Sequence, residues 1–154
     1  MASGAAGVGR AAVLAVLAVG IGGCAGGVRV PNPMGGKPAY SAAVDQALGA
    51  AKTDMAALYA GLQTAPPACT GAANADQFAK VLADLDQAAR AAKAVAHDDR
   101  TVAGVADLRQ STTTLQTLAA GRPDCLPPAV VQDTAKVVAL NLGELIKYEQ
   151  AKGR

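Results

Sequence analysis

The side chains with the most specific chemistry in this chain of 154 residues are three cysteines and a single histidine. The cysteines are Cys24, Cys69 and Cys125, and the histidine is His97. A cysteine thiolate can act as a nucleophile or a metal ligand, and two cysteines can form a disulfide. The cysteines are too far apart in sequence for a C-x-x-C site, and a lone histidine cannot supply a histidine-rich metal site. These spacings predict neither a metal centre nor a haem.

Carboxylates and hydroxyls offer no catalytic arrangement either. Asp84 and Asp86 are two positions apart, so their side chains diverge on a helix. The run STTT at residues 111–114 lacks a partner base that would turn a hydroxyl into a nucleophile. The acidic residues of the run HDD at residues 97–99 are expected in a turn, as a helix cap and solvated charge rather than a metal cluster. We therefore expect no enzymatic activity, no catalytic residue and no bound cofactor or metal.

The N-terminal segment has the layout of an export signal. One positive charge, Arg10, precedes the apolar run AAVLAVLAVGIGG and then Cys24. A positive start, an apolar stretch of about 7–15 residues and small residues before a cleavage point describe a secretory signal. The end of the run, Ile21-Gly22-Gly23-Cys24, resembles the lipobox of bacterial lipoproteins, in which an aliphatic residue and two small residues precede a cysteine. The resemblance implies that residues 1–23 are cleaved off and that the Cys24 thiol carries a diacylglycerol.

Two alternatives to this interpretation remain. The first is an uncleaved membrane anchor, because the uncharged stretch 11–28 is just long enough to cross a hydrocarbon core of about 30 Å. Its second half is rich in glycine, which weakens that alternative. The second is an ordinary secretory signal followed by an unmodified cysteine. The lipobox resemblance favours lipidation, and with it a location on the outer face of a bacterial membrane, periplasmic or extracytoplasmic. In lipoproteins of Gram-negative bacteria, the absence of an aspartate at position 25 favours the outer membrane.

Residues 24–40 are predicted to be a flexible tether. Their sequence, CAGGVRVPNPMGGKPAY, contains prolines and glycines throughout, which excludes regular structure. The 16 residues that follow Cys24 reach at most about 53 Å when extended and about 22 Å as a random coil. This segment is long enough to hold a small domain just clear of a membrane surface.

The rest of the chain is predicted to be all-α. Apolar residues make up 51% of the sequence and aromatic residues only 3%. Alanine and short aliphatic residues favour helices, whereas the β-branched and aromatic residues that favour strands are too scattered for a sheet. The formal net charge is +2 with both signs mixed along the chain, so no nucleic-acid partner is expected.

Four periodic stretches predict helices at about residues 41–63, 74–97, 99–120 and 127–151, within a domain of residues 41–152. Ser41 is a suitable N-cap for the first helix, and Asn74 followed by Gln77 resembles a capping box for the second. The apolar stripe changes phase near residue 98. This shift predicts a tight turn between the second and third helices, with one long bent helix as the alternative.

Short connections favour antiparallel neighbours, so the expected fold is an up-down-up-down four-helix bundle. This topology brings the loops of Cys69 and Cys125 to one end. Disulfides persist in exported proteins, and we therefore predict a bond between Cys69 and Cys125. Two free thiols and intermolecular pairing are the alternatives.

Taken together, these features predict a membrane-anchored bacterial lipoprotein whose bundle is a non-enzymatic interaction or structural module of the cell envelope. The expected partners are the membrane, through the lipid on Cys24, and an envelope protein. Two alternatives are a chaperone that binds a partner helix, since the layout is similar in architecture to secretin-assembly pilotins, and a carrier of a small apolar ligand. The sequence specifies neither the partner nor the oligomeric state.

Overall fold

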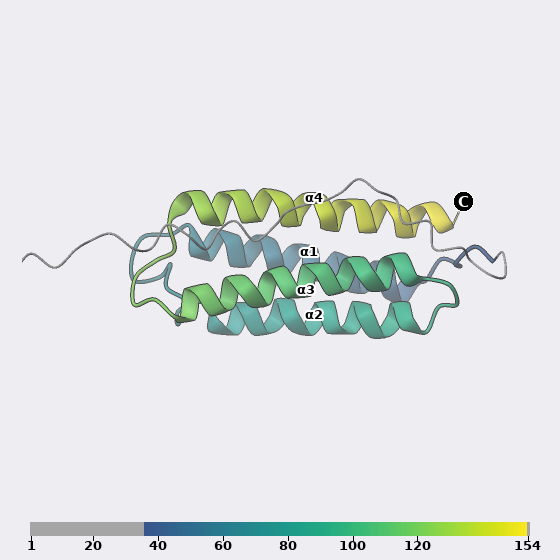
Figure 1. The fold of residues 1–154 in the computed structure, drawn as a ribbon, viewed down its shortest axis with the longest axis horizontal. Helices are drawn as coiled ribbons and strands as arrows, with labels where there is room; N and C mark the ends of the chain where they lie inside the picture. The colour runs from purple at the N-terminus through teal and green to yellow at the C-terminus, as the bar shows by residue number, and fades with distance from the viewer. Residues whose placement is uncertain (1–35, 154) are drawn as a thin grey trace, which may run out of the picture. The chain divides into compact units, whose positions relative to one another are not determined.

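Four α-helices make up the part of the protein that the computed structural model describes, residues 36–153. They are α1 (Ala42–Leu62), α2 (Ala75–Lys93), α3 (Asp99–Ala120) and α4 (Pro128–Lys152), and no strand occurs between residues 36 and 153 (Figure 1). The all-helical prediction is confirmed. The expected signal peptide, Cys24 and most of the expected tether lie outside the described residues.

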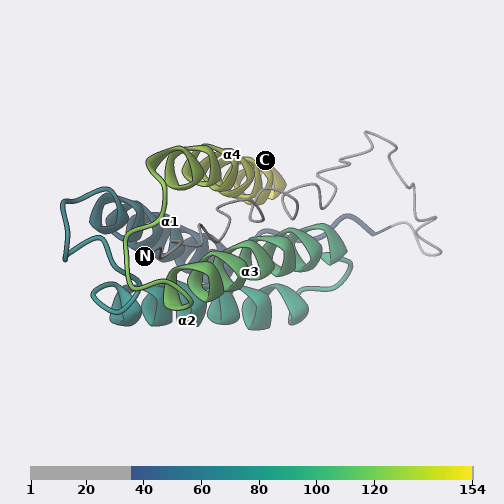
Figure 2. The same cartoon turned by 60° about the vertical axis from the view of Figure 1, so that its left-hand side comes forward.

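The helices pack side by side as a helical bundle. α1 contacts α2 and α4, and α3 contacts the same two helices. Figure 1 shows the connections that follow α1 and α3 at one end of the bundle, and the short turn between α2 and α3 at the other end. In the turned view of Figure 2, α4 lies along α1 and α3, away from α2. Each helix therefore buries its apolar stripe against two neighbours.

α1 begins at the residue that its sequence favours as a cap. Ser41 has an extended backbone, and its Oγ accepts a hydrogen bond of 3.3 Å from the N–H of Val44. Apolar residues then recur every three or four positions, which keeps one face toward the core. Eight of the 21 residues of α1 are buried: Val44, Ala47, Leu48, Ala51, Met55, Leu58, Tyr59 and Leu62.

The second and third helices are separated by a turn, as the change of phase predicted. α2 ends at Lys93, and α3 begins at Asp99. Between them, His97 has a φ of 63°, in the left-handed region that non-glycine residues rarely adopt. This residue reverses the chain, so the alternative of one long bent helix is excluded.

The predicted capping box at the start of α2 is wrong. Asn74 makes no side-chain cap hydrogen bond. Its Nδ2 instead donates to the carbonyl oxygens of Ala68 at 2.8 Å and Thr70 at 2.9 Å. The Gln77 side chain reaches across to α1 and donates to the backbone oxygen of Asp54 at 3.0 Å. The preceding loop therefore uses the Asn74 side chain, and a contact with α1 uses the Gln77 side chain, in place of the local cap.

The core combines a few large side chains with many small ones. Phe78, Leu48 and Leu85 are fully buried between the helices. Ala51 and Ala88 are also fully buried, and such small side chains allow helix axes to approach closely while each removes little apolar area from water. The packing thus depends on close helix contacts and less on bulky side chains.

Candidate functional site

The predicted lipid attachment site, Cys24, lies outside the described residues. Within residues 36–153, no helix is both long enough and apolar enough to cross a bilayer. The structure bears on three other places: the two remaining cysteines, the opposite end of the bundle, and the contact between α1 and α2.

The structure brings Cys69 and Cys125 to disulfide distance, with their Cα atoms 5.3 Å apart. Cys69 lies in the connection between α1 and α2, and Cys125 in the connection between α3 and α4. Cys69 is 2% exposed, whereas Cys125 is half-buried. The pair joins two connections that are 56 residues apart in sequence.

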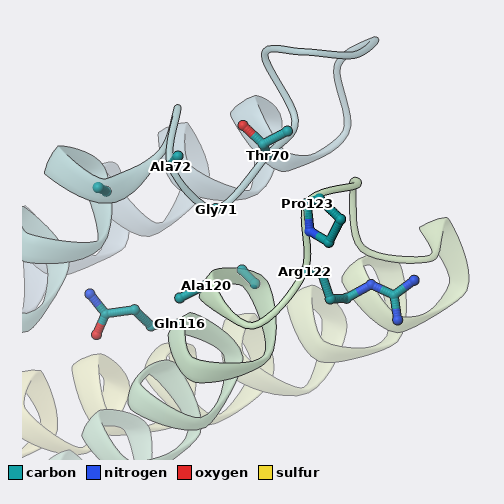
Figure 3. Close-up of a pocket in the computed structure, with 9 residues that line it drawn as sticks. Thr70, Gly71, Ala72, Gln116, Ala120, Arg122 and Pro123 are labelled. Carbon is teal, nitrogen blue, oxygen red and sulfur yellow. The ribbon is translucent and has the colours of Figure 1, made fainter. Parts of the chain in front are cut away.

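A surface hollow of about 310 Å³ lies near this end, between the start of α2 and the end of α3 (Figure 3). Gly71 lines it and packs closely against α3, since a Cβ there would lie 2.6 Å from the carbonyl carbon and oxygen of Ala119. Among the polar lining residues, Thr70 is engaged by its own loop, since its hydroxyl donates to Pro67 and accepts from Ala73. Small-molecule sites usually combine an apolar pocket with a few converging polar groups. The hollow is mainly apolar, and the loop itself uses the Thr70 hydroxyl.

An ionic cluster occupies the opposite end of the bundle. The ammonium of Lys152 lies 2.6 Å from Oδ1 of Asp98 and 2.5 Å from Oε2 of Glu149, and it donates to Oγ1 of Thr101 at 3.3 Å. Thr101 and Glu149 are 0% exposed and Asp98 is 2% exposed. The other oxygen of Glu149 accepts a hydrogen bond of 2.7 Å from the backbone N–H of Ser41. The cluster therefore joins the start of α1, the turn before α3 and the end of α4.

The charge balance of the ionic cluster depends on Lys152. Two carboxylates face one ammonium, and Oδ2 of Asp98 is buried without a hydrogen-bond partner among the described residues. Burial acts to lower the pKa of Lys152, but hydrogen bonds to Asp98 and Glu149, together with their charges, outweigh it and raise that pKa above its ordinary value. The ring of Tyr148 lies beside the cluster, 4.7 Å from the Lys152 ammonium and 4.3 Å from the Arg100 guanidinium carbon. Lys152 is therefore charged in the folded protein at neutral pH.

The expectation that Asp98 is a cap and a solvated charge is wrong. Asp98 precedes α3, but its side chain makes no cap hydrogen bond and is buried. The reason is tertiary, since Lys152 at the end of α4 brings a buried positive charge to this turn. The neighbouring His97 and Asp99 are exposed.

A second pair of acidic side chains lies between α1 and α2. Oδ2 of Asp84 is buried without a hydrogen-bond partner in the described part of the chain. Burial, followed by the close approach and the charge of the Asp54 carboxyl, raises the pKa of Asp84, and Lys80 offsets this rise only in part. Gln77 donates to Oδ1 of Asp54 at 3.3 Å, and the Lys80 ammonium lies 3.8 Å from the same atom. The fold therefore favours the protonated form of Asp84 more than the unfolded chain does.

The remaining candidate groups make structural contacts. Asp86 accepts a hydrogen bond of 2.7 Å from Arg109 on α3, while Asp84 faces α1, so the two carboxylates diverge as expected. The hydroxyls of Ser111 and Thr112 each donate to the backbone carbonyl four residues earlier. Between residues 36 and 153, no three histidine, cysteine or acidic side chains are grouped so as to hold a metal ion.

Sequence reasoning missed Glu149 and Lys152, although the sequence does contain a signal for them. Val138, Leu142 and Leu145 follow each other at steps of four and three, and the next step of four falls on Glu149. A carboxylate in a buried register needs a compensating partner, and Lys152 stands three positions further on. A charged residue that continues an apolar stripe therefore indicates an internal ion pair.

The comparisons with known proteins identify no relative of this chain. No protein-family model matches it, and neither a search of curated proteins nor a search of solved structures gives a significant match. The function must therefore be argued from the residues of this chain alone.

Proposed function

We propose that the protein is a bacterial lipoprotein, anchored to a membrane through Cys24, whose helical bundle is a non-enzymatic interaction or structural module of the cell envelope. The observation that carries this proposal is the sequence Ile21-Gly22-Gly23-Cys24 after an apolar run and a single Arg10. The location that follows from it is the periplasmic or extracytoplasmic face of a bacterial membrane, and in a Gram-negative source Ala25 after the cysteine is compatible with the outer membrane.

The proposal includes an up-down-up-down order of the helices and a disulfide between Cys69 and Cys125. The 5.3 Å separation of the two Cα atoms supports the bond, and an exported protein lies in a compartment where disulfides persist. The ionic cluster supports the same order of helices, because it joins Ser41 to the end of α4. The tether would then enter at the end with the ionic cluster, and the cysteine pair would face away from the membrane.

Exposed apolar side chains on α4 support an interaction role. Leu140 is 69% exposed and Val137 is 46% exposed, one helical turn apart. Leu118 on α3 is 45% exposed. These exposed apolar side chains favour the second candidate, a pilotin-like chaperone that binds a partner helix, over a carrier of a small ligand.

Metabolic labelling with a palmitate analogue in a bacterial host tests the proposal. We expect the wild-type protein to take up the label and to fractionate with membranes, and Cys24→Ala to lose both properties. The matched control is the double variant Cys69→Ala/Cys125→Ala, which keeps Cys24 and should remain labelled. An unlabelled wild type, or equal labelling of Cys24→Ala, would show that this cysteine carries no lipid.

A further inference from the structure

α4 is held in the bundle differently from the other helices. It buries five of its 25 residues, whereas α1 buries eight of 21. One of the five is the charged Glu149, so the buried apolar side chains of α4 are only four: Val131, Val138, Leu142 and Leu145. The packing of α4 against α1 and α3 is also less extensive than the packing of α1 and α3 against α2.

The two ends of α4 are both fastened by specific contacts. At its start, Cys125 lies three residues before Pro128 and at disulfide distance from Cys69. At its end, Glu149 and Lys152 bind the start of α1 and the turn before α3. Between these points, α3 and α4 line an open surface hollow of about 350 Å³. The contact beside it is made at Gly104, where a Cβ would lie 2.6 Å from Cδ2 of Leu145.

We propose that α4 is a hinged arm of the bundle, pivoting about the connection at residues 121–127 and held closed at its other end by Lys152. The ionic cluster contains two carboxylates and one ammonium, so removal of the ammonium leaves two buried carboxylates without compensation. Water must then reach the carboxylates, and α4 separates from α1 and α3, most widely in the half that follows Val138, which lies farther from the pivot. The motion uncovers the apolar side of α4 while α1, α2 and α3 stay packed. The proposal concerns the bundle alone and does not depend on lipid attachment.

Residue-resolved hydrogen exchange under native conditions tests the proposal on the purified protein. In the wild type, we expect the amides of residues 138–152 to exchange through a partial opening, faster than the core amides of α2 by at least about tenfold. In Lys152→Met, the exchange of residues 138–152 should rise by a further factor of about a hundred. The amides of α1, other than those of its first turn, and of α2 should change much less.

The matched control is Lys147→Met, which removes an exposed lysine from the same helix. Lys147 forms a surface ion pair with Glu144 at 3.1 Å, and its loss should change exchange by less than about threefold. Lys152→Arg keeps the cation and should stay much closer to the wild type than Lys152→Met. If Lys152→Met does not fold, the wild-type comparison still decides the matter. If the amides of α2 and of the second half of α4 exchange at the same rate in the wild type, α4 opens only when the whole bundle unfolds, and the proposal is wrong.

Discussion

At the scale of single residues, Lys152 is the charged side chain whose loss we expect to destabilise the described bundle most, because it compensates two buried carboxylates. Exposed ion pairs such as that of Lys147 contribute about 0–1 kcal/mol. Loss of one partner from a buried pair costs about 3–5 kcal/mol, because the remaining charge has no compensation. Because the pKa of Lys152 is raised in the folded state, this lysine makes the free energy of unfolding depend on pH. Its stabilising contribution is complete below pH 10.5 and is lost as the pH rises through the folded-state pKa.

Asp84 makes the opposite contribution to the stability of the bundle. Its folded-state pKa lies above the ordinary value of 3.8, so the folded state binds this proton more tightly than the unfolded state does. Stability is therefore lost as the pH rises from 3.8 through the raised value. We expect Asp84→Asn to stabilise the protein at neutral pH by about 1 kcal/mol or less, because a neutral amide places no second charge beside Asp54. Urea unfolding at several pH values between 3 and 8 measures the effect.

The control for this substitution is Asp133→Asn. Asp133 is 77% exposed and pairs with Lys136 within α4, so its loss should leave both the stability and its pH dependence nearly unchanged. If Asp84→Asn is less stable than the wild type at pH 7, the charged form of Asp84 stabilises the folded protein, in contradiction to the expectation from its buried oxygen.

At the scale of elements, two glycines occur for different reasons. Gly71 is required by close packing against another helix, whereas Gly143 only lowers the helix propensity of α4. At Gly71, a Cβ would meet backbone atoms of Ala119 at 2.6 Å, and backbone cannot move aside as a flexible side chain can. At Gly143, inside α4, a Cβ would meet no heavy atom within 4 Å. We expect Gly71→Ala to destabilise the protein by about 1–3 kcal/mol, and Gly143→Ala to stabilise it by about 0.5–1 kcal/mol. Chemical unfolding of the two variants side by side checks both signs, and equal effects would contradict the close contact at Gly71.

The helices could be predicted from the sequence because their signals are local. Ser41 caps the helix that it precedes, and the change of phase near residue 98 marks a real turn. The ionic cluster could not be predicted in the same way, because its members come from three segments that meet only in the folded chain. Gln77 illustrates the same limit, since its side chain binds a backbone oxygen of α1 instead of capping α2, while Asn74 binds carbonyl oxygens of the loop before it. Local propensity therefore predicted the elements, and long-range electrostatics decided the polar contacts at their ends.

At the scale of the whole molecule, the cysteine pair is the feature most open to direct measurement. Its two connections are 56 residues apart, and closing a loop of that length stabilises by about 4 kcal/mol in the chain-entropy description. We expect the native protein to show no alkylatable thiol at Cys69 or Cys125 before reduction, and its midpoint of urea unfolding to fall after reduction. Intact mass after alkylation measures the first effect. If both thiols are alkylated in the unreduced, folded protein, Cys69 and Cys125 are neighbouring free cysteines and form no disulfide.

The hydrogen bond between the Ser41 amide and Glu149 means that the bundle starts and finishes at almost the same point. A domain with adjacent ends can be spliced into a surface turn of another protein without stretching its host. Residues 36–153 are therefore suited to use as an insertion cassette. The contacts that hold α4 in place would then also hold the two ends of the host turn together. A fluorescent label on the host near this turn would report whether α4 is packed against the bundle.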